Sequence, residues 1–194
     1  MTTVFFDVDT QIDFLFPAGA LYVPAAETMI ERVAALNRHA VSHGATVIST
    51  MDAHAEDDPE FKIYPHHCVA GTIAQHKPAS TLVEKCVIVP NTPREPDIEP
   101  GRQILLEKQK LDCFTNVNLR PLLDRLKADR YVVYGVVTEI CVKYAAFGLL
   151  ESGKRVEMVT DAVRSLTEEA GSRTLAEFMA AGGVLTTVAE ISGS

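Results

Sequence analysis

The segment that decides the fold is Arg130-Tyr-Val-Val-Tyr-Gly-Val-Val137, a short and almost wholly apolar run followed at once by Thr138-Glu-Ile-Cys141. A run of β-branched and aromatic residues without alternation is typical of a strand that is buried in a parallel sheet. The residues from Val142 to Ser152 have the pattern of a helix that ends at Gly153. Cys141 is therefore predicted to lie where a buried strand runs into a helix.

A cysteine in the first turn of a helix has distinctive chemistry. Unpaired backbone N–H groups and the positive end of the helix dipole favour its thiolate over its thiol. The same N–H groups can stabilise the oxyanion that forms when the sulfur attacks a carbonyl group. A single cysteine in such a place is more often a packed core thiol. The rest of the chain has to decide whether Cys141 is a nucleophile.

Strand and helix patterns alternate along the chain on both sides of this segment. Further strand patterns lie at 3–6, 45–50, 85–89, 103–106, 155–159 and 184–188, and helix patterns at 25–43, around 119–126 and from about 165. Ser165 and Glu168 have the spacing of a capping box, so we expect the last helix to begin there. This alternation predicts a three-layer α/β/α fold with a mostly parallel central sheet, formed by residues 1–194 as one domain. The functional site of such a sheet lies at the carboxyl ends of its strands.

Composition and charge argue against several classes of protein. The 194 residues carry a formal net charge of −8, which disfavours nucleic acid or an anionic membrane surface as a partner. The sequence contains no apolar run of the length of a membrane span, and its N-terminus lacks the charged leader of a signal peptide. The four cysteines do not have the spacing of a disulfide framework, which favours a cytoplasmic location.

Three ionisable residues follow predicted strands and could act on a cysteine. Asp9 comes after the strand pattern at 3–6 and could accept a thiol proton and return it to a leaving amine. Lys108 and Lys110 follow the pattern at 103–106, where a lysine could stabilise a thiolate. The residue pattern alone does not distinguish these two lysines, and an acid after a strand is as often a turn cap.

The long loop region at 51–80 contains metal-capable side chains. Asp52 and His54 follow the second strand pattern, and Glu60 and His67 come later in the loop. Carboxylate and imidazole groups together form a mixed N/O set that suits Zn²⁺, Fe²⁺ or Mn²⁺. Because long loops in compact domains are usually functional, these four residues are candidate metal ligands.

The first strand pattern also permits a different function. Phe5-Phe-Asp-Val-Asp9 resembles the nucleophile motif of haloacid-dehalogenase-like phosphatases, in which Asp7 would be phosphorylated. That motif has Thr or Val where this chain has Gln11, and the later pair of Mg²⁺-binding acids is reduced to Asp161. A phosphatase that uses Asp7 is therefore the remote alternative.

Three segments, each after a predicted strand, resemble the isochorismatase-like cysteine hydrolases. Asp9-x-Gln-x-Asp13-Phe14 resembles the opening motif of the family, Lys108 has the family spacing to Phe114, and Gly135 to Val142 resembles the nucleophile turn. The resemblance runs from about residue 3 to residue 188. It implies a catalytic triad of Asp9, Lys108 and Cys141, an oxyanion site formed by the backbone N–H groups of Val137 and Cys141, and a cis peptide bond at Val136–Val137.

Within this family the chain is most similar to nicotinamidases. Asp52-x-His54 and Pro65-His-His67-Cys-Val-x-Gly-Thr72 resemble the metal-binding segments of that subgroup. The resemblance implies that Asp52, His54, Glu60 and His67 bind a divalent metal, with Zn²⁺ expected and Fe or Mn as alternatives. Glu60 stands where many members have a histidine. Phe14 and Tyr64 are the residues expected to pack on the substrate ring.

The resemblance also implies a reaction. Cys141 would attack the carboxamide of nicotinamide, Asp9 would transfer the proton to the departing ammonia, and water would hydrolyse the thioester to nicotinate. The main alternative is a metal-independent hydrolase of another small amide or carbamoyl compound that uses the same triad. The expected partner is a small-molecule amide. Family members often form dimers or tetramers, so a homo-oligomer remains an open expectation.

Overall fold

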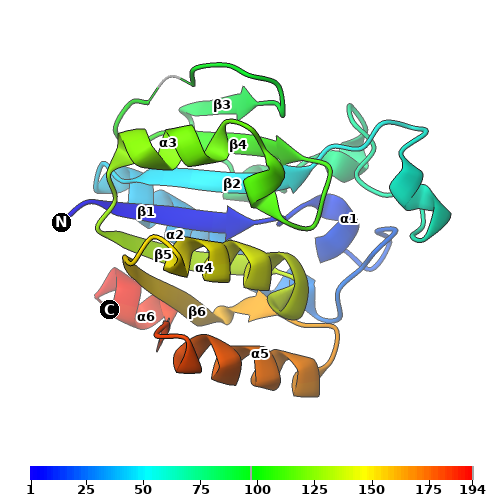
Figure 1. Ribbon diagram of the computed structural model, residues 1–194. Coiled ribbons are helices and arrows are strands. Elements are labelled where there is room, and N and C mark those ends of the chain that lie inside the picture. The colour runs from blue at the N-terminus through cyan, green and yellow to red at the C-terminus, as the bar shows by residue number, and fades with distance from the viewer. Residues whose placement is uncertain (97, 194) are drawn as a thin grey trace.

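A single seven-stranded sheet forms the centre of the molecule in the computed structural model, which describes residues 1–96 and 98–193 (Figure 1). The strand order is β3-β4-β2-β1-β5-β6-β7, and each pair of neighbouring strands is parallel. The strands are β1 (Thr3–Val8), β2 (Thr46–Asp52), β3 (Cys86–Val89), β4 (Gln103–Lys108), β5 (Arg130–Val136), β6 (Arg155–Arg164) and β7 (Val184–Thr186).

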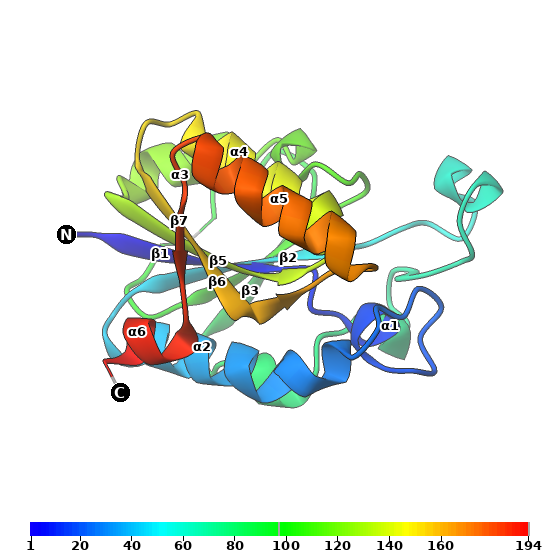
Figure 2. The same ribbon diagram turned by 90° about the horizontal axis from the view of Figure 1, so that it is seen from below.

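Helices cover both faces of the sheet, with α2 and α6 on one face and α3, α4 and α5 on the other (Figure 2). Their bounds are α1 (Ile12–Leu15), α2 (Ile30–Ser42), α3 (Leu119–Leu126), α4 (Lys143–Leu150), α5 (Glu168–Ala180) and α6 (Val188–Ser192). Single helical turns are η1 (Ala26–Met29), η2 (Pro59–Lys62), η3 (Ile73–Gln75), η4 (Ala79–Thr81), η5 (Cys113–Thr115) and η6 (Thr138–Val142). The three-layer α/β/α prediction is confirmed. None of the helices in the described part of the chain has the length and apolar character needed to cross a bilayer.

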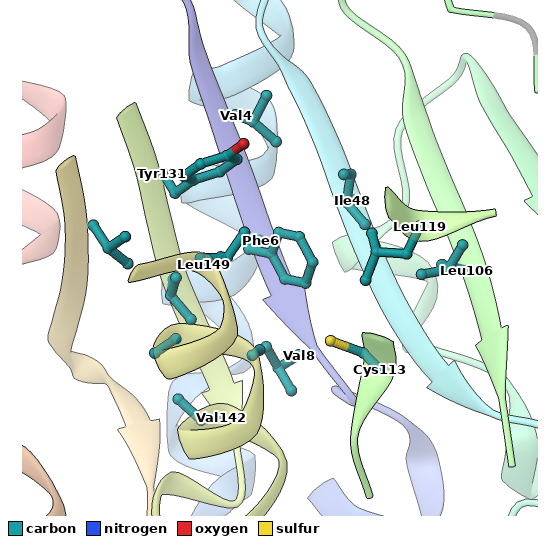
Figure 3. Close-up of a cluster of buried hydrophobic side chains, with 14 of the residues drawn as sticks. Val4, Phe6, Val8, Ile48, Leu106, Cys113, Leu119, Tyr131, Val142 and Leu149 are labelled. Carbon is teal, nitrogen blue, oxygen red and sulfur yellow. The ribbon is translucent and has the colours of Figure 1, made fainter. Parts of the chain in front are cut away.

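The two faces of the sheet bury two separate apolar clusters, because successive residues of a strand point to opposite sides. Phe6 lies on the side of the sheet that α4 covers, in one cluster with Leu149 (Figure 3), and Val133 belongs to the same cluster. Phe5 and Tyr134 belong to the cluster under α2. Full burial of each such side chain stabilises the fold by about 1.5–3 kcal/mol. These clusters fix the sheet, and the sheet in turn fixes the strand ends.

The start of α5 differs from the sequence prediction. The hydroxyl of Thr167 accepts a hydrogen bond from the backbone N–H of Ala170 at 3.2 Å, so Thr167 is the N-cap and α5 begins at Glu168. The predicted capping box of Ser165 and Glu168 is wrong because β6 continues to Arg164, which leaves Ser165 in the connection.

The chain end also differs from the prediction of a strand at 184–188. The last strand stops at Thr186, and Thr187 then forms a complete capping box with Glu190 that starts α6. The sequence Thr187-Val-Ala-Glu190 has the spacing of a capping box, which indicates a helix start. The apolar residues at 184–188 continue into this segment, so the pattern of the strand extends past its true end.

Asp7 of β1 lies in a buried polar network on the face of the sheet that α2 covers. One carboxylate oxygen accepts a hydrogen bond from Thr10 Oγ1 at 2.6 Å, and the other accepts from Ser49 Oγ at 2.9 Å and lies 3.3 Å from Lys77 Nζ. Asn37 of α2 donates to the same oxygen at 3.3 Å. Both oxygens are thus engaged and shielded from solvent, which argues against the alternative of a phosphatase with Asp7 as nucleophile.

Replacing Lys77 with methionine tests this buried ion pair. Lys77→Met keeps most of the side-chain stem but leaves the Asp7 carboxylate buried without its countercharge. Breaking a buried pair in this way is expected to lower the free energy of unfolding by about 3–5 kcal/mol, measured by urea denaturation. The matched control is exposed Lys154→Met, which should change it by less than about 0.5 kcal/mol. Equal stability of the two variants would contradict this role for Lys77.

Candidate active site

The candidate site lies at the carboxyl edge of the four neighbouring strands β4, β2, β1 and β5. Asp9 follows β1, Asp52 ends β2, Lys108 ends β4, and Cys141 follows β5. The parallel register places Asp52 directly beside Lys108 on the neighbouring strand. Residues far apart in the sequence are therefore brought together because their strands end at the same edge of the sheet.

The ammonium group of Lys108 lies at the centre of this arrangement. Its Nζ is 2.9 Å from Asp9 Oδ2 and 2.5 Å from Asp52 Oδ1, and it lies 3.8 Å from Cys141 Sγ. All four residues are buried. Lys110, the other candidate, is exposed two residues beyond the strand. Lys108 is therefore the lysine that the structure places beside the thiol.

Burial and charge together set the protonation of this cluster. Burial raises the pKa of the Cys141 thiol well above its usual value, Lys108 opposes that shift, and Asp9 adds to it. Burial also opposes the charge on Lys108, but Asp52 and Asp9 hold the pKa of its ammonium group well above its usual range. Burial and Asp9 thus favour the neutral thiol of Cys141, which lies beside a carboxylate that can take its proton.

The turn that carries Cys141 is built differently from the predicted α-helical start. Residues Thr138–Val142 form one π-helical turn, closed by a hydrogen bond from the Val142 N–H to the Val137 carbonyl at 3.1 Å, and α4 begins only at Lys143. Turns of this kind are frequent at functional sites. The peptide bond between Val136 and Val137 is cis, as the family resemblance implies.

Gly135 allows β5 to come close to β1 just before this turn. It has a φ of 125°, and a Cβ atom at this position would lie 2.1 Å from the backbone oxygen of Val8. A side chain would therefore separate the two central strands. Glycine at this position keeps the Cys141 turn next to the end of β1 that carries Asp9.

Thr50 and Gln11 hold the carboxylates in place, and the sequence analysis did not identify either as a site residue. Asp9 has a left-handed backbone with a φ of 49°, and its Oδ1 accepts a hydrogen bond from Thr50 Oγ1 at 2.6 Å. Gln11 bonds to both backbone groups of Asp52, donating to its carbonyl at 2.8 Å and accepting from its N–H at 2.7 Å. These contacts orient Asp9 and Asp52 toward Lys108.

Asp52, His54 and His67 form a buried cluster that could bind a metal ion. One ligand atom from each lies within 4.8 Å of the others. The Nδ1 atoms of both histidines have partners, which leaves both Nε2 atoms free to face the cluster. His54 Nε2 lies 4.0 Å from Asp52 Oδ2 and is buried without a hydrogen-bond partner. A buried nitrogen without a partner is costly, and a divalent ion would satisfy it, so these residues fit the metal.

Glu60 lies at the border of this cluster. Its Oε1 is 3.9 Å from His67 Nε2, but it is not part of the group formed by Asp52, His54 and His67. The segment that carries Glu60 and His67 extends beyond the carboxyl edge of the sheet on the side of α1 (Figures 1 and 2). Glu60 is thus within reach of an ion held by the other three residues.

One cavity of about 300 Å³ opens onto both the thiol and the metal-capable cluster. Phe14 and Tyr64 line it, as the resemblance implied for residues that pack on a ring. The Phe14 ring lies 5.9 Å from the His67 ring, and the Tyr64 ring lies 6.5 Å from it at the more exposed side. Polar groups come from Asp52, Glu60, His67 and Cys141, and further apolar walls from Leu21, Leu111, Ile140 and Leu166. A cavity of this size, with apolar walls and a polar base, suits a small ring compound.

Known proteins share this fold and sequence over nearly the whole chain. The nicotinamidase of Escherichia coli (strain K12) is 24% identical over an alignment of 205 positions, which covers 94% of this chain and 93% of that protein. An isochorismatase family protein of Bacillus subtilis (strain 168) is 26% identical over 175 residues, covering 88% of this chain and 91% of that one. The crystal structure of the pyrazinamidase of Pyrococcus horikoshii in complex with zinc has a TM-score of 0.79 and 26% identity, covering 96% of this chain and 99% of that chain. Residues 3–190 match the sequence model of the isochorismatase domain, and the chain therefore belongs to the isochorismatase family.

Proposed function

We propose that this member of the amide-hydrolysing isochorismatase family is a metal-assisted cysteine amidohydrolase that converts nicotinamide to nicotinate and ammonia. The observation that carries the proposal is the shared cavity, which is lined by Cys141 at one point and by Asp52 and His67 at another. A pyridine carboxamide has two functional ends, a ring nitrogen and an amide. The nicotinamidase and the zinc-bound pyrazinamidase among the relatives support the same substrate class.

Asp9, Lys108 and Cys141 have the arrangement that nucleophilic attack on an amide needs. Asp9 takes the thiol proton as the sulfur bonds to the carboxamide carbon, and the C–N bond then breaks as Asp9 returns that proton to the departing ammonia. The buried ammonium group of Lys108 stays charged and stabilises the thiolate as it forms. The oxyanion is assigned to the backbone N–H groups of Val137 and Cys141. Water then hydrolyses the thioester and releases nicotinate.

The candidate metal ligands and two aromatic residues orient the substrate in the same cavity. Asp52, His54 and His67, with Glu60 beside them, would hold the divalent ion, which supplies a Lewis-acidic position for the ring nitrogen. Zn²⁺ fits the N/O set, as do Fe²⁺ and Mn²⁺. Phe14 and Tyr64 pack on the ring, which holds the carboxamide at the sulfur.

Loss of the nucleophile tests the reaction itself. Cys141→Ala is expected to reduce ammonia release from nicotinamide by at least about 1,000-fold, because no other group can form the thioester. The assay couples ammonia release to glutamate dehydrogenase. The control is Cys86→Ala, which removes an exposed thiol and should retain full activity. Turnover by Cys141→Ala would refute the covalent mechanism, and no turnover by metal-loaded wild type would refute nicotinamide as the substrate.

Removal of the metal tests the role of Asp52, His54 and His67. Treatment with a strong chelator is expected to abolish nicotinamide turnover, because the ring is no longer held, and added Zn²⁺ should restore it. The alkylation of Cys141 by iodoacetamide should persist in the chelated protein, since Asp9 and Lys108 remain in place. Turnover of another small amide or carbamoyl compound that survives chelation, with no turnover of nicotinamide, would instead favour the metal-independent hydrolase.

The pKa of Cys141 should move in opposite directions when its two charged neighbours are replaced. Asp9 raises this pKa and Lys108 lowers it, so Asp9→Asn should shift it down and Lys108→Met should shift it up. The pH dependence of iodoacetamide alkylation in a Cys86→Ala background measures both shifts. Asp9→Asn should nevertheless lose amide hydrolysis, because the proton acceptor is gone. Retained hydrolysis in that variant would show that Asp9 is not the base.

A further inference from the structure

The carboxylate of Asp58 contacts two of the candidate metal ligands at once. Its Oδ2 lies 3.0 Å from His54 Nδ1, and its Oδ1 accepts a hydrogen bond from the backbone N–H of Glu60 at 2.9 Å. Asp58 is the N-cap of η2, the short helical turn that begins with Pro59 and contains Glu60. We propose that Asp58 is the positioning residue of the metal site, which joins the histidine next to the sheet to the glutamate on the loop. This inference rests on the proposed function, because it takes the cluster to bind a metal.

The first contact selects one tautomer of the neutral His54 ring. A carboxylate can only accept hydrogen bonds, so the proton of the neutral imidazole lies on Nδ1, and the lone pair lies on Nε2. That Nε2 is the buried atom without a partner that faces Asp52 Oδ2 at 4.0 Å. Ligating histidines commonly donate their other ring N–H to a carboxylate, which orients the ring and raises its basicity as a ligand.

The second contact fixes the place of Glu60. The backbone N–H of Phe61 also bonds to the carbonyl of Asp58 at 3.0 Å. The side chain and the backbone of Asp58 therefore both bond to the first turn of η2. The Phe61 ring packs 5.4 Å from the His54 ring and 5.6 Å from the His67 ring. The turn that presents Glu60 is therefore anchored directly to both histidines.

A role for Asp58 as a metal ligand fits the geometry less well. Asp58, His54 and Glu60 do lie close enough to form a ligand group of their own. Asp58, however, occupies the Nδ1 side of His54, whereas the atom without a partner is Nε2, on a different edge of the ring. An ion held by Nε2 together with Asp52 and His67 leaves Asp58 outside the ligand group, as a hydrogen-bond acceptor.

Two substitutions separate the contacts of Asp58. In Asp58→Asn the amide oxygen can still accept from the Glu60 N–H, but the amide NH₂ then donates to His54 Nδ1, which moves the ring proton to Nε2 and removes the ligand lone pair. Asp58→Ser retains a good N-cap for η2 but is too short to reach His54. The matched control is Asp57→Asn, which removes the same charge from an exposed neighbour. The measurement is the Zn²⁺ dissociation constant, obtained by competition with a chromophoric chelator, together with the melting temperature of each metal-free protein.

We expect Asp58→Asn and Asp58→Ser to bind Zn²⁺ about 10–100-fold more weakly than wild type, with Asp57→Asn unchanged. The metal-free form of Asp58→Ser should melt at the wild-type temperature, which separates a loss of positioning from a loss of folding. Wild-type Zn²⁺ affinity in Asp58→Ser would overturn this inference and leave the proposed function intact. Failure of the wild-type protein to bind Zn²⁺ would overturn both the inference and the metal-assisted function.

Discussion

The buried ammonium group of Lys108 is the charge on which the rest of the site depends. A charge taken out of water costs several kcal/mol unless partners of opposite charge compensate it. Here the partners are Asp9 at 2.9 Å and Asp52 at 2.5 Å, and they come from two neighbouring strands. Because the register of β4, β2 and β1 sets these distances, the sheet keeps the ammonium group of Lys108 paired with both carboxylates. The two apolar clusters hold the strands in this register and thereby keep Lys108, Asp9 and Asp52 at these distances.

Asp52 links that charge cluster to the metal-capable residues. Its Oδ1 accepts from Lys108, while its Oδ2 faces His54 Nε2 at 4.0 Å. One carboxylate thus belongs both to the group that tunes Cys141 and to the group that would hold an ion. A cation bound on the Oδ2 side would weaken the electrostatic attraction between this carboxylate and Lys108. Metal binding would thereby be coupled to the electrostatics of the thiol.

Strand patterns in the sequence predict the positions of side chains that lie at strand ends. They do not predict the positions of side chains that depend on contacts between distant segments. Strand patterns and the family resemblance were enough to place Asp9, Asp52 and Cys141 at one edge. The residue pattern alone does not separate Lys108 from Lys110, because both follow the same strand. The family spacing to Phe114 favours Lys108, and the structure places Lys108, not Lys110, beside Asp52 of β2. The bonds from Thr50 and Asp58 join residues whose types are common in strands and loops, so no pattern marked them. The pattern at Ser165 and Glu168 predicts a helix cap in the wrong place, because the length of β6 cannot be predicted from its apolar residues alone.

The sheet and the loop make separate contributions to this site. Lys108 and the residues next to it are fixed by strand register, which leaves little freedom to change the hydrolytic chemistry. Glu60, Tyr64 and His67 instead lie on a segment held by a few hydrogen bonds, among them the one from the backbone N–H of Cys68 to Asp13 Oδ2 at 2.6 Å. Loops on a rigid scaffold can change their side chains at low cost to folding. In the proposed function the sheet edge therefore carries the hydrolytic residues, whereas Glu60, Tyr64 and His67 of the loop join Phe14 of α1 around the substrate.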